Sequence, residues 1–211
     1  MNNSNVFRTI AIVSALIAFG AGVGIYTAQK QRAQIPPQIE GLMWPEAKTL
    51  LPFSTIDQDG MEFGLQNLQG KWSFLFFGYT NCPDICPITL SVFNQVYENL
   101  GVEHANDTQM IFISVDPERD TSERLRDYVN YFNKDFIGLG GSVEQIKSLT
   151  GQLGIPYFPH EVSADGDYLV DHSASIFLIN PEAELIAVLS APHQTNDVSS
   201  RFLKIKAFFE K

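Results

Sequence analysis

Cysteine is nearly absent from this sequence. Only Cys82 and Cys86 occur among 211 residues, and three residues separate them. Small domains that depend on disulfides carry many more cysteines, and closing so short a loop adds little stability, so a structural disulfide is disfavoured. An iron–sulfur cluster would normally take four cysteines. The pair therefore indicates redox chemistry or a metal site with few sulfur ligands.

Charged residues are absent from residues 9–29, and acidic residues are absent from residues 1–33. The mostly apolar run from Ile10 to Ala28 matches the roughly 20 residues that cross a bilayer. We expect an uncleaved membrane anchor at 9–28, preceded by a cytoplasmic segment at 1–8 and followed by a tether at 29–49. The alternative is a cleavable signal peptide, whose apolar core is normally shorter.

No arginine- and serine-rich transit peptide precedes the expected anchor. This absence favours a bacterial inner membrane, with the following domain in the periplasm. The alternative is a mitochondrial inner membrane, with the domain facing the intermembrane space.

Basic residues are also scarce beyond the expected anchor. Removing the three positive charges of Arg8, Lys30 and Arg32 from the net charge of −10 leaves −13 for the remaining residues. An acidic domain of this kind is not expected to bind nucleic acid. No internal repeat is present.

Residues 50–211 alternate between short apolar runs and amphipathic segments. The run at 72–77 is nearly continuous in apolar residues, with one serine inside, which is typical of a central strand covered on both faces. Strands that alternate with helices predict a parallel core sheet. The chain is therefore expected to form an α/β, thioredoxin-like (peroxiredoxin-like) mixed sheet flanked by helices. Further strands are expected at 108–115, 136–139, 168–170, 175–180 and 185–189, and helices from about 87 to 100, from 120, from 142 to 153 and at 198–209.

Local turn and capping signals support these boundaries. An Asp-Gly turn at Gly60 predicts an N-terminal β-hairpin over residues 52–63. Asp120, with Glu123 three residues later, is expected to cap the helix that follows residue 119. Ser142 and Gln145 form the pattern of a capping box for the next helix.

The two cysteines lie where the central strand passes into a helix. Pro87 is favourable in a first helical turn, which places Cys86 at or near the helix start. Free backbone N–H groups and the helix dipole there favour a thiolate. Two thiolates are soft ligands that select Cu(I), zinc or iron–sulfur clusters. With so few sulfurs, the donor inventory favours copper over zinc, which prefers four protein ligands in structural sites.

Four histidines compete for a third ligand position: His104, His160, His172 and His193. His104 lies in a polar stretch, His160 follows an aromatic and proline segment, and His193 follows a strand in an expected turn. His172 differs because it precedes an apolar strand, where a chain that folds back on the sheet would face the cysteine loop. On residue chemistry alone, a lone histidine is more often structural, so the choice stays open.

Three separated stretches resemble the signatures of the Sco/SenC family. They are Phe76-Phe-Gly-Tyr-Thr-Asn-Cys82-Pro-Asp-Ile-Cys86-Pro, Ser114-Val-Asp-Pro-Glu-Arg-Asp120-Thr and Tyr168-Leu-Val-Asp-His172-Ser-Ala-Ser. The resemblance implies a thioredoxin-like domain over 50–211 that binds copper, as Cu(I) or Cu(II), through Cys82, Cys86 and His172. It also implies a role in assembling the binuclear copper site of cytochrome c oxidase.

Two carboxylates are further candidates near this site. Asp116 ends the strand beside the cysteine-bearing strand and could orient a ligand, or it could simply cap a turn before Pro117. Asp171 could orient His172, although adjacent strand residues point to opposite faces.

Two functions remain open at this point. The first is a copper metallochaperone that delivers copper to the copper domain of cytochrome c oxidase subunit II, with another copper chaperone as its donor. The second is a thiol–disulfide oxidoreductase that reduces the copper-site cysteines of that subunit through Cys82 and Cys86. A peroxidase is disfavoured because the Pro-x-x-x-Thr-x-x-Cys pattern is missing.

Overall fold

The structure is a computed structural model that describes residues 42–43 and 47–210. The expected anchor at 9–28 and most of the expected tether at 29–49 lie outside these residues. No helix in the described part of the chain is both long and apolar enough to span a bilayer.

The sheet is built around strand β5 (Trp72–Gly78), in which all seven residues are buried. β5 runs parallel to β6 (Thr108–Ser114), and β6 runs parallel to β7 (Ile137–Gly140). On its other side β5 pairs with the antiparallel strand β10 (Ile176–Ile179). The predicted central strand is therefore confirmed, since β5 has a neighbour on each edge and apolar layers on both faces.

Antiparallel strands complete the sheet at both edges. β3 (Ser54–Asp57) pairs with β7 and with β4 (Glu62–Gly64), which confirms the N-terminal hairpin. β11 (Glu184–Leu189) pairs with β10. Within the described residues, nine strands form this sheet, because two short strands, β1 (Leu42–Met43) and β2 (Lys48–Thr49), also pair with β11. These two strands extend the sheet into residues expected to form the tether.

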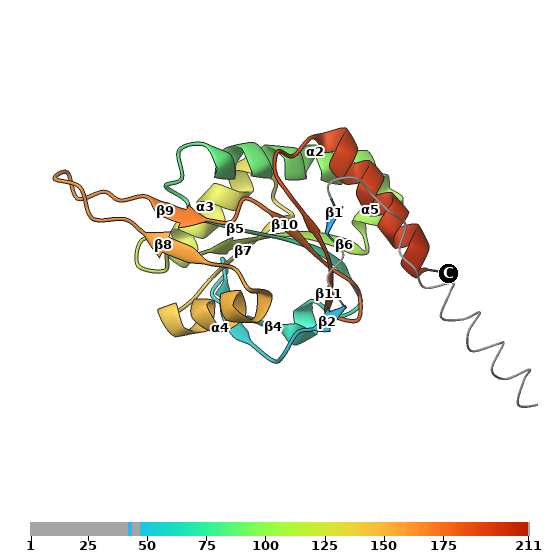
Figure 1. Cartoon of the computed structure of the whole chain (residues 1–211), viewed down its shortest axis with the longest axis horizontal. Helices are drawn as coiled ribbons and strands as arrows, with labels where there is room; N and C mark the ends of the chain where they lie inside the picture. The colour runs from blue at the N-terminus through green and yellow to red at the C-terminus, as the bar shows by residue number, and fades with distance from the viewer. Residues whose placement is uncertain (1–41, 44–46, 211) are drawn as a thin grey trace, which may run out of the picture. The chain divides into compact units, whose positions relative to one another are not determined.

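Helices cover both faces of the sheet (Figure 1). Side chains of Phe74 and Phe76 pack with α2 (Ile85–Ala105), α3 (Ser122–Phe132) and α5 (Thr195–Phe209). The alternate side chains, Leu75 and Phe77, pack with α4 (Val143–Leu153) and the 3₁₀ turn η1 (Leu65–Asn67). The period-2 alternation of a strand sends successive aromatic side chains into opposite layers. This arrangement confirms the predicted α/β class.

A two-stranded ribbon stands apart from the main sheet (Figure 1). β8 (Tyr157–Pro159) pairs with β9 (Val170–His172), and neither pairs with another strand among the described residues. The sequence did not predict strand β8, because the segment has no alternation of apolar and polar residues. In the structure Phe158 and Pro159 are both exposed. The expected strand at 168–170 is shifted to 170–172, so His172 ends a strand instead of following one.

The helix caps match expectation at one helix and differ at another. For α4, the Gln145 backbone N–H donates to Ser142 Oγ at 3.3 Å, and the Ser142 N–H donates to Gln145 Oε1 at 2.8 Å. The expected cap of α3 by Asp120 is wrong, because Thr121 is the cap and its Oγ1 accepts from the Arg124 N–H at 3.3 Å. The Asp120 carboxylate has other donors, described below.

The capping box of α4 predicts a stability effect at a distance from the cysteines. Replacing Ser142 with alanine removes the acceptor for one free helix N–H and should lower the free energy of unfolding by about 1 kcal/mol, measured by urea denaturation. Ser148→Ala is the matched control, since Ser148 is an exposed residue inside the same helix. An equal loss in both variants would contradict the role of the cap.

Candidate metal centre

The cysteines lie on the loop and helix that follow β5. The Cys82 backbone N–H donates to the Tyr79 carbonyl at 3.2 Å, which closes a tight turn directly after the strand. Cys86 is the second residue of α2, as predicted. Its side chain is fully buried, whereas Cys82 is only half-buried, and both are free thiols. One sulfur therefore faces the protein core and the other lies nearer to solvent.

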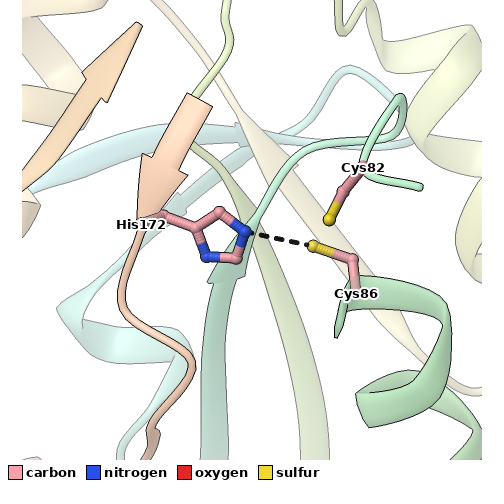
Figure 2. Close-up of side chains that lie close together, drawn as sticks. All are labelled: Cys82, Cys86 and His172. Atoms are coloured by element: carbon pink, nitrogen blue, oxygen red, sulfur yellow. Dashed lines mark hydrogen bonds between the residues drawn. The ribbon is translucent and has the colours of Figure 1, made fainter. Parts of the chain in front are cut away.

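His172 reaches the same place from the end of β9 (Figure 2). His172 Nε2 lies 3.5 Å from Cys86 Sγ, and the three ligand atoms of Cys82, Cys86 and His172 lie within 4.8 Å of one another. Among the described residues, no other group of histidine, cysteine and carboxylate side chains is placed to hold a metal ion. The structure thus brings together the three residues singled out in the sequence.

The imidazole of His172 is oriented on several sides. Its Nδ1 donates to the Ser173 carbonyl at 3.1 Å, which leaves the lone pair of Nε2 directed toward the sulfurs. The rings of Phe76 and Tyr79 meet it edge to face, with centroid distances of 6.0 and 5.8 Å. Metal-binding histidines characteristically use the second ring nitrogen in this way, because the hydrogen bond selects the tautomer.

Gly78, the last residue of β5, makes room for the Cys86 sulfur. A Cβ atom at this position would lie 2.4 Å from Cys86 Sγ and 2.8 Å from Cε2 of Phe112. Neither neighbour can move easily, since Cys86 and Phe112 are both buried in the same apolar layer. A residue without a side chain is required where the sulfur packs against the strand.

The two thiols differ in acidity because they differ in environment. The hydrogen bond that the Cys86 thiol donates to Cys82, together with backbone N–H groups, lowers the pKa of Cys82 to about 3. Burial is the main reason that the pKa of Cys86 is raised, and its hydrogen bond to Cys82 raises it further. The expectation of a thiolate at Cys86 is therefore not supported in the metal-free pair. The desolvation of Cys86 outweighs the favourable helix start, and the thiolate belongs to Cys82.

Asp120 supports the cysteine loop, a role that sequence reasoning missed. Its buried carboxylate accepts from the Thr80 backbone N–H at 2.9 Å, the Thr80 hydroxyl at 2.6 Å and the Ser114 hydroxyl at 2.6 Å. Thr80 lies two residues before Cys82, so these bonds fix the start of the loop. The pattern Asp120–Glu123 suggested a helix cap, which concealed the long-range role. The available signal was the position of Asp120 in one of the three family-like stretches.

Asp116 is buried but is not bonded to the three ligand atoms. Its carboxylate accepts from the Tyr168 hydroxyl at 2.6 Å and from Arg119 Nε at 2.5 Å. Burial of Tyr168 is the larger cause, and its hydrogen bond to Asp116 the next, of a rise in the pKa of Tyr168 to about 12. The phenol therefore remains a proton donor at neutral pH. The Asp116 backbone N–H bonds to Ser114 Oγ at 3.0 Å. Asp116 thus contacts the segment leading to His172 and not a ligand itself.

Asp171 and the other histidines lie away from the three ligand atoms. Asp171 is exposed and its Oδ2 lies 2.9 Å from His160 Nε2, because successive residues of β9 point to opposite sides. His104 Nδ1 lies 3.1 Å from Lys206 Nζ at the far end of α2. His193 Nε2 donates to the Ala174 carbonyl at 2.7 Å, and burial lowers the pKa of His193. Only His172 is near the sulfurs.

Comparisons with known proteins agree with this site. The sequence model of the SCO1/SenC family matches residues 44–207. The chain is 36% identical over 208 residues to "Protein SCO1 homolog 1, mitochondrial" of Arabidopsis thaliana, covering 92% of this chain and 61% of the relative. It is 34% identical over 184 residues to an SCO2-like protein of Rickettsia conorii, covering 87% of this chain and 89% of the relative.

A solved structure extends the comparison to three dimensions. The crystal structure of Arabidopsis thaliana ScoI with copper bound superposes with a TM-score of 0.69 at 38% identity, covering 74% of this chain and 98% of that one. The family match over residues 44–207 includes both cysteines, Asp120 and His172. The chain belongs to the SCO1/SenC family.

Proposed function

We propose that this protein is a copper metallochaperone that binds copper through Cys82, Cys86 and His172. The observation that carries the proposal is the convergence of two sulfurs and one imidazole nitrogen within 4.8 Å. Soft sulfur donors select Cu(I) over harder ions, and an imidazole also suits Cu(II). The copper bound to the related ScoI structure supports this assignment.

The unequal burial of the sulfurs is suited to a cargo that must leave again. Cys86 and the oriented His172 form the inner part of the site, whereas the half-buried Cys82 lies on a loop that an acceptor can approach. Ligand exchange at Cys82 would let incoming cysteine or histidine ligands replace those of this protein one at a time.

The acceptor that family membership favours is the binuclear copper site in subunit II of cytochrome c oxidase, with another copper chaperone as the donor. The domain, whose sheet already includes β1 and β2 from the expected tether, would be held at a bacterial inner membrane by an anchor at 9–28 and would face the periplasm. The alternative location is the mitochondrial inner membrane, facing the intermembrane space. Neither location requires a nucleic-acid partner.

Removal of individual ligands tests copper binding. Cys86→Ser should lower Cu(I) affinity by more than the roughly 10–100-fold typical of losing a partner of a metal ligand, because an entire soft donor is lost. His172→Ala should weaken Cu(I) binding less and should change the visible and electron paramagnetic resonance spectra of the Cu(II) form. Anaerobic competition with a Cu(I) chelator measures the first effect.

His160→Ala is the matched control for the histidine variant. His160 lies on the same ribbon, but it pairs with Asp171 away from the sulfurs. It should keep the affinity and both spectra of the unmodified protein. Unchanged Cu(I) affinity in Cys86→Ser would rule out the three-ligand site.

The packing of Gly78 against Cys86 gives a second test. Gly78→Ala places a methyl group 2.4 Å from Cys86 Sγ, so the sulfur must move and copper affinity should fall by at least about 10-fold. Gly151→Ala is the control, since Gly151 lies in α4 with open space around its missing Cβ. Competition titration of both folded variants compares them. If Gly78→Ala binds copper as tightly as Gly151→Ala, the sulfur does not depend on this close contact.

A second function is favoured by the two free and adjacent thiols. In a thiol–disulfide exchange, the Cys82 thiolate would attack a disulfide of the oxidase subunit and release one of its cysteines. Cys86, after losing its proton, would then attack Cys82 Sγ and release the other cysteine. The pair would end as a disulfide, and its two electrons would reduce the substrate. The half-buried Cys82 and the fully buried Cys86 match the attacking and resolving positions.

The acidity of Cys82 predicts an unusual reactivity profile. Because its pKa is lowered, the iodoacetamide alkylation rate of Cys82 should change by less than about twofold between pH 8 and pH 6, since the thiolate persists at both values. An ordinary thiol would lose roughly 100-fold in rate over this interval. Mass spectrometry of the reduced, metal-free protein locates the label. A loss of the ordinary size at Cys82 would show that Cys82 is not the stabilised thiolate.

A further inference from the structure

The ribbon that carries His172 has few main-chain links to the rest of the domain. β8 and β9 pair only with each other among the described residues, and three residues separate His172 from β10. A cavity of about 530 Å³ lies against the ribbon and is lined by residues that include Val115, Tyr157 and Tyr168. Hydrogen bonds of the main sheet therefore do not determine how far His172 Nε2 lies from the sulfurs. Side-chain contacts must do so.

Arg119 makes the densest set of these contacts. Its guanidinium donates to Asp116 and to Asp167, each at 2.5 Å, and to the Tyr168 carbonyl at 2.9 Å. The guanidinium carbon also lies 3.6 Å from the centroid of the Tyr168 ring. The Tyr168 hydroxyl in turn donates to Asp116. The planar guanidinium thus bonds to the side chain of Asp167 and to the main chain of Tyr168, which lie five and four residues before His172.

The turn that carries Arg119 also holds the cysteine side of the site. Asp120, the next residue, binds Thr80 at the start of the cysteine loop. The turn follows β6, and the Val115 backbone N–H donates to the Gly78 carbonyl at 2.8 Å. Two adjacent residues of one short turn therefore hold the two segments that supply the ligands. Asp120 holds the segment of Cys82, and Arg119 holds the segment of His172.

We propose that Arg119 is a positioning residue that keeps His172 against Cys82 and Cys86 by clamping Tyr168 and Asp167 to the turn after β6. Arg119 touches none of the three ligand atoms and acts through the ribbon. Lysine could not replace it, because a single ammonium group lacks the planar fork and the stacking surface that these contacts use. The inference deepens the proposed copper function and depends on the geometry of the same site.

The main test is a double-mutant cycle between Arg119 and His172. Arg119→Gln should weaken Cu(I) binding about 10–100-fold, as expected for a residue that orients a ligand. In the His172→Ala background the same change should alter affinity by less than about twofold, because the ligand through which Arg119 acts is already gone. An equal loss in both backgrounds would overturn the proposal, since it would show an effect independent of His172.

A copper-free readout separates this proposal from the proposed function. In the reduced, metal-free protein, nuclear magnetic resonance should find the proton of the His172 ring on Nδ1, where Ser173 accepts it. In Arg119→Gln the two tautomers should become mixed as the ring loses its orientation. If this change occurs but no tight copper binding is found in any variant, the copper function fails and the positioning role stands. If copper binds tightly and Arg119→Gln matches the unmodified protein in both readouts, the positioning role is wrong.

Two further variants complete the test: one is a control for the loss of an arginine elsewhere, and the other removes part of the contacts around Arg119. Arg126→Gln removes an arginine on α3 that pairs with Asp59 at 3.1 Å and donates to the Gln58 carbonyl at 2.7 Å, at the hairpin beyond β7. It should leave copper affinity and the His172 tautomer unchanged.

Tyr168→Phe removes only the hydroxyl bonded to Asp116 and keeps the ring under Arg119. It should cause a smaller shift in the same direction as Arg119→Gln, and an unchanged tautomer together with unchanged affinity would count against the clamp.

Discussion

The close packing of the Cys86 sulfur against the end of β5 is the constraint on which the rest of the site depends. Gly78 leaves a space that no side chain could share, and the first turn of α2 places Cys86 Sγ in it. This fixes one donor atom in the core of the domain. The other two donors reach that point from a loop and from a ribbon, and each needs its own support.

Buried polar contacts supply that support. Asp120 is almost fully buried, yet three donors satisfy its carboxylate, so its desolvation is offset and the cysteine loop is fixed. Asp116 and Arg119 form a similar satisfied cluster under the ribbon. Removing one member of such a cluster leaves its partners unpaired at low dielectric, which makes the geometry sensitive to single substitutions. The turn after β6 is therefore a structural link between the loop that carries Cys82 and the ribbon that carries His172, two segments far apart in sequence.

The difference between the two cysteines follows from the same arrangement. The fully buried sulfur loses hydration and holds its proton, and the half-buried sulfur collects the hydrogen bonds and the negative charge. Such a pair can hold a soft metal ion on the inner side and exchange it on the outer side. It can also begin a disulfide exchange at the outer sulfur. One geometry is therefore compatible with both of the chemistries proposed above.

Several features could be read from the sequence because their causes are local. The nearly continuous apolar run at 72–77 indicated a central strand, the position of Pro87 indicated the start of α2, and the Ser142–Gln145 pattern indicated a capping box; all three are present. The spacing of the cysteines and the family-like stretch around His172 identified the candidate ligands. These signals depend on residues within a few positions of one another.

Only the tertiary structure decided what depends on distant residues. Capping propensity pointed to a helix cap at Asp120, but the fold brings its carboxylate within hydrogen-bonding distance of Thr80, forty residues away. Helix position favoured a thiolate at Cys86, yet burial outweighed the helix dipole and the charge lies on Cys82. The short strand β8 carries no periodic signal and exists because it pairs with β9. The sequence by itself thus determined most of the core strands and helices and the candidate ligand residues, whereas desolvation and long-range hydrogen bonding determined the spacing of those ligands, their charge and the residues that hold them.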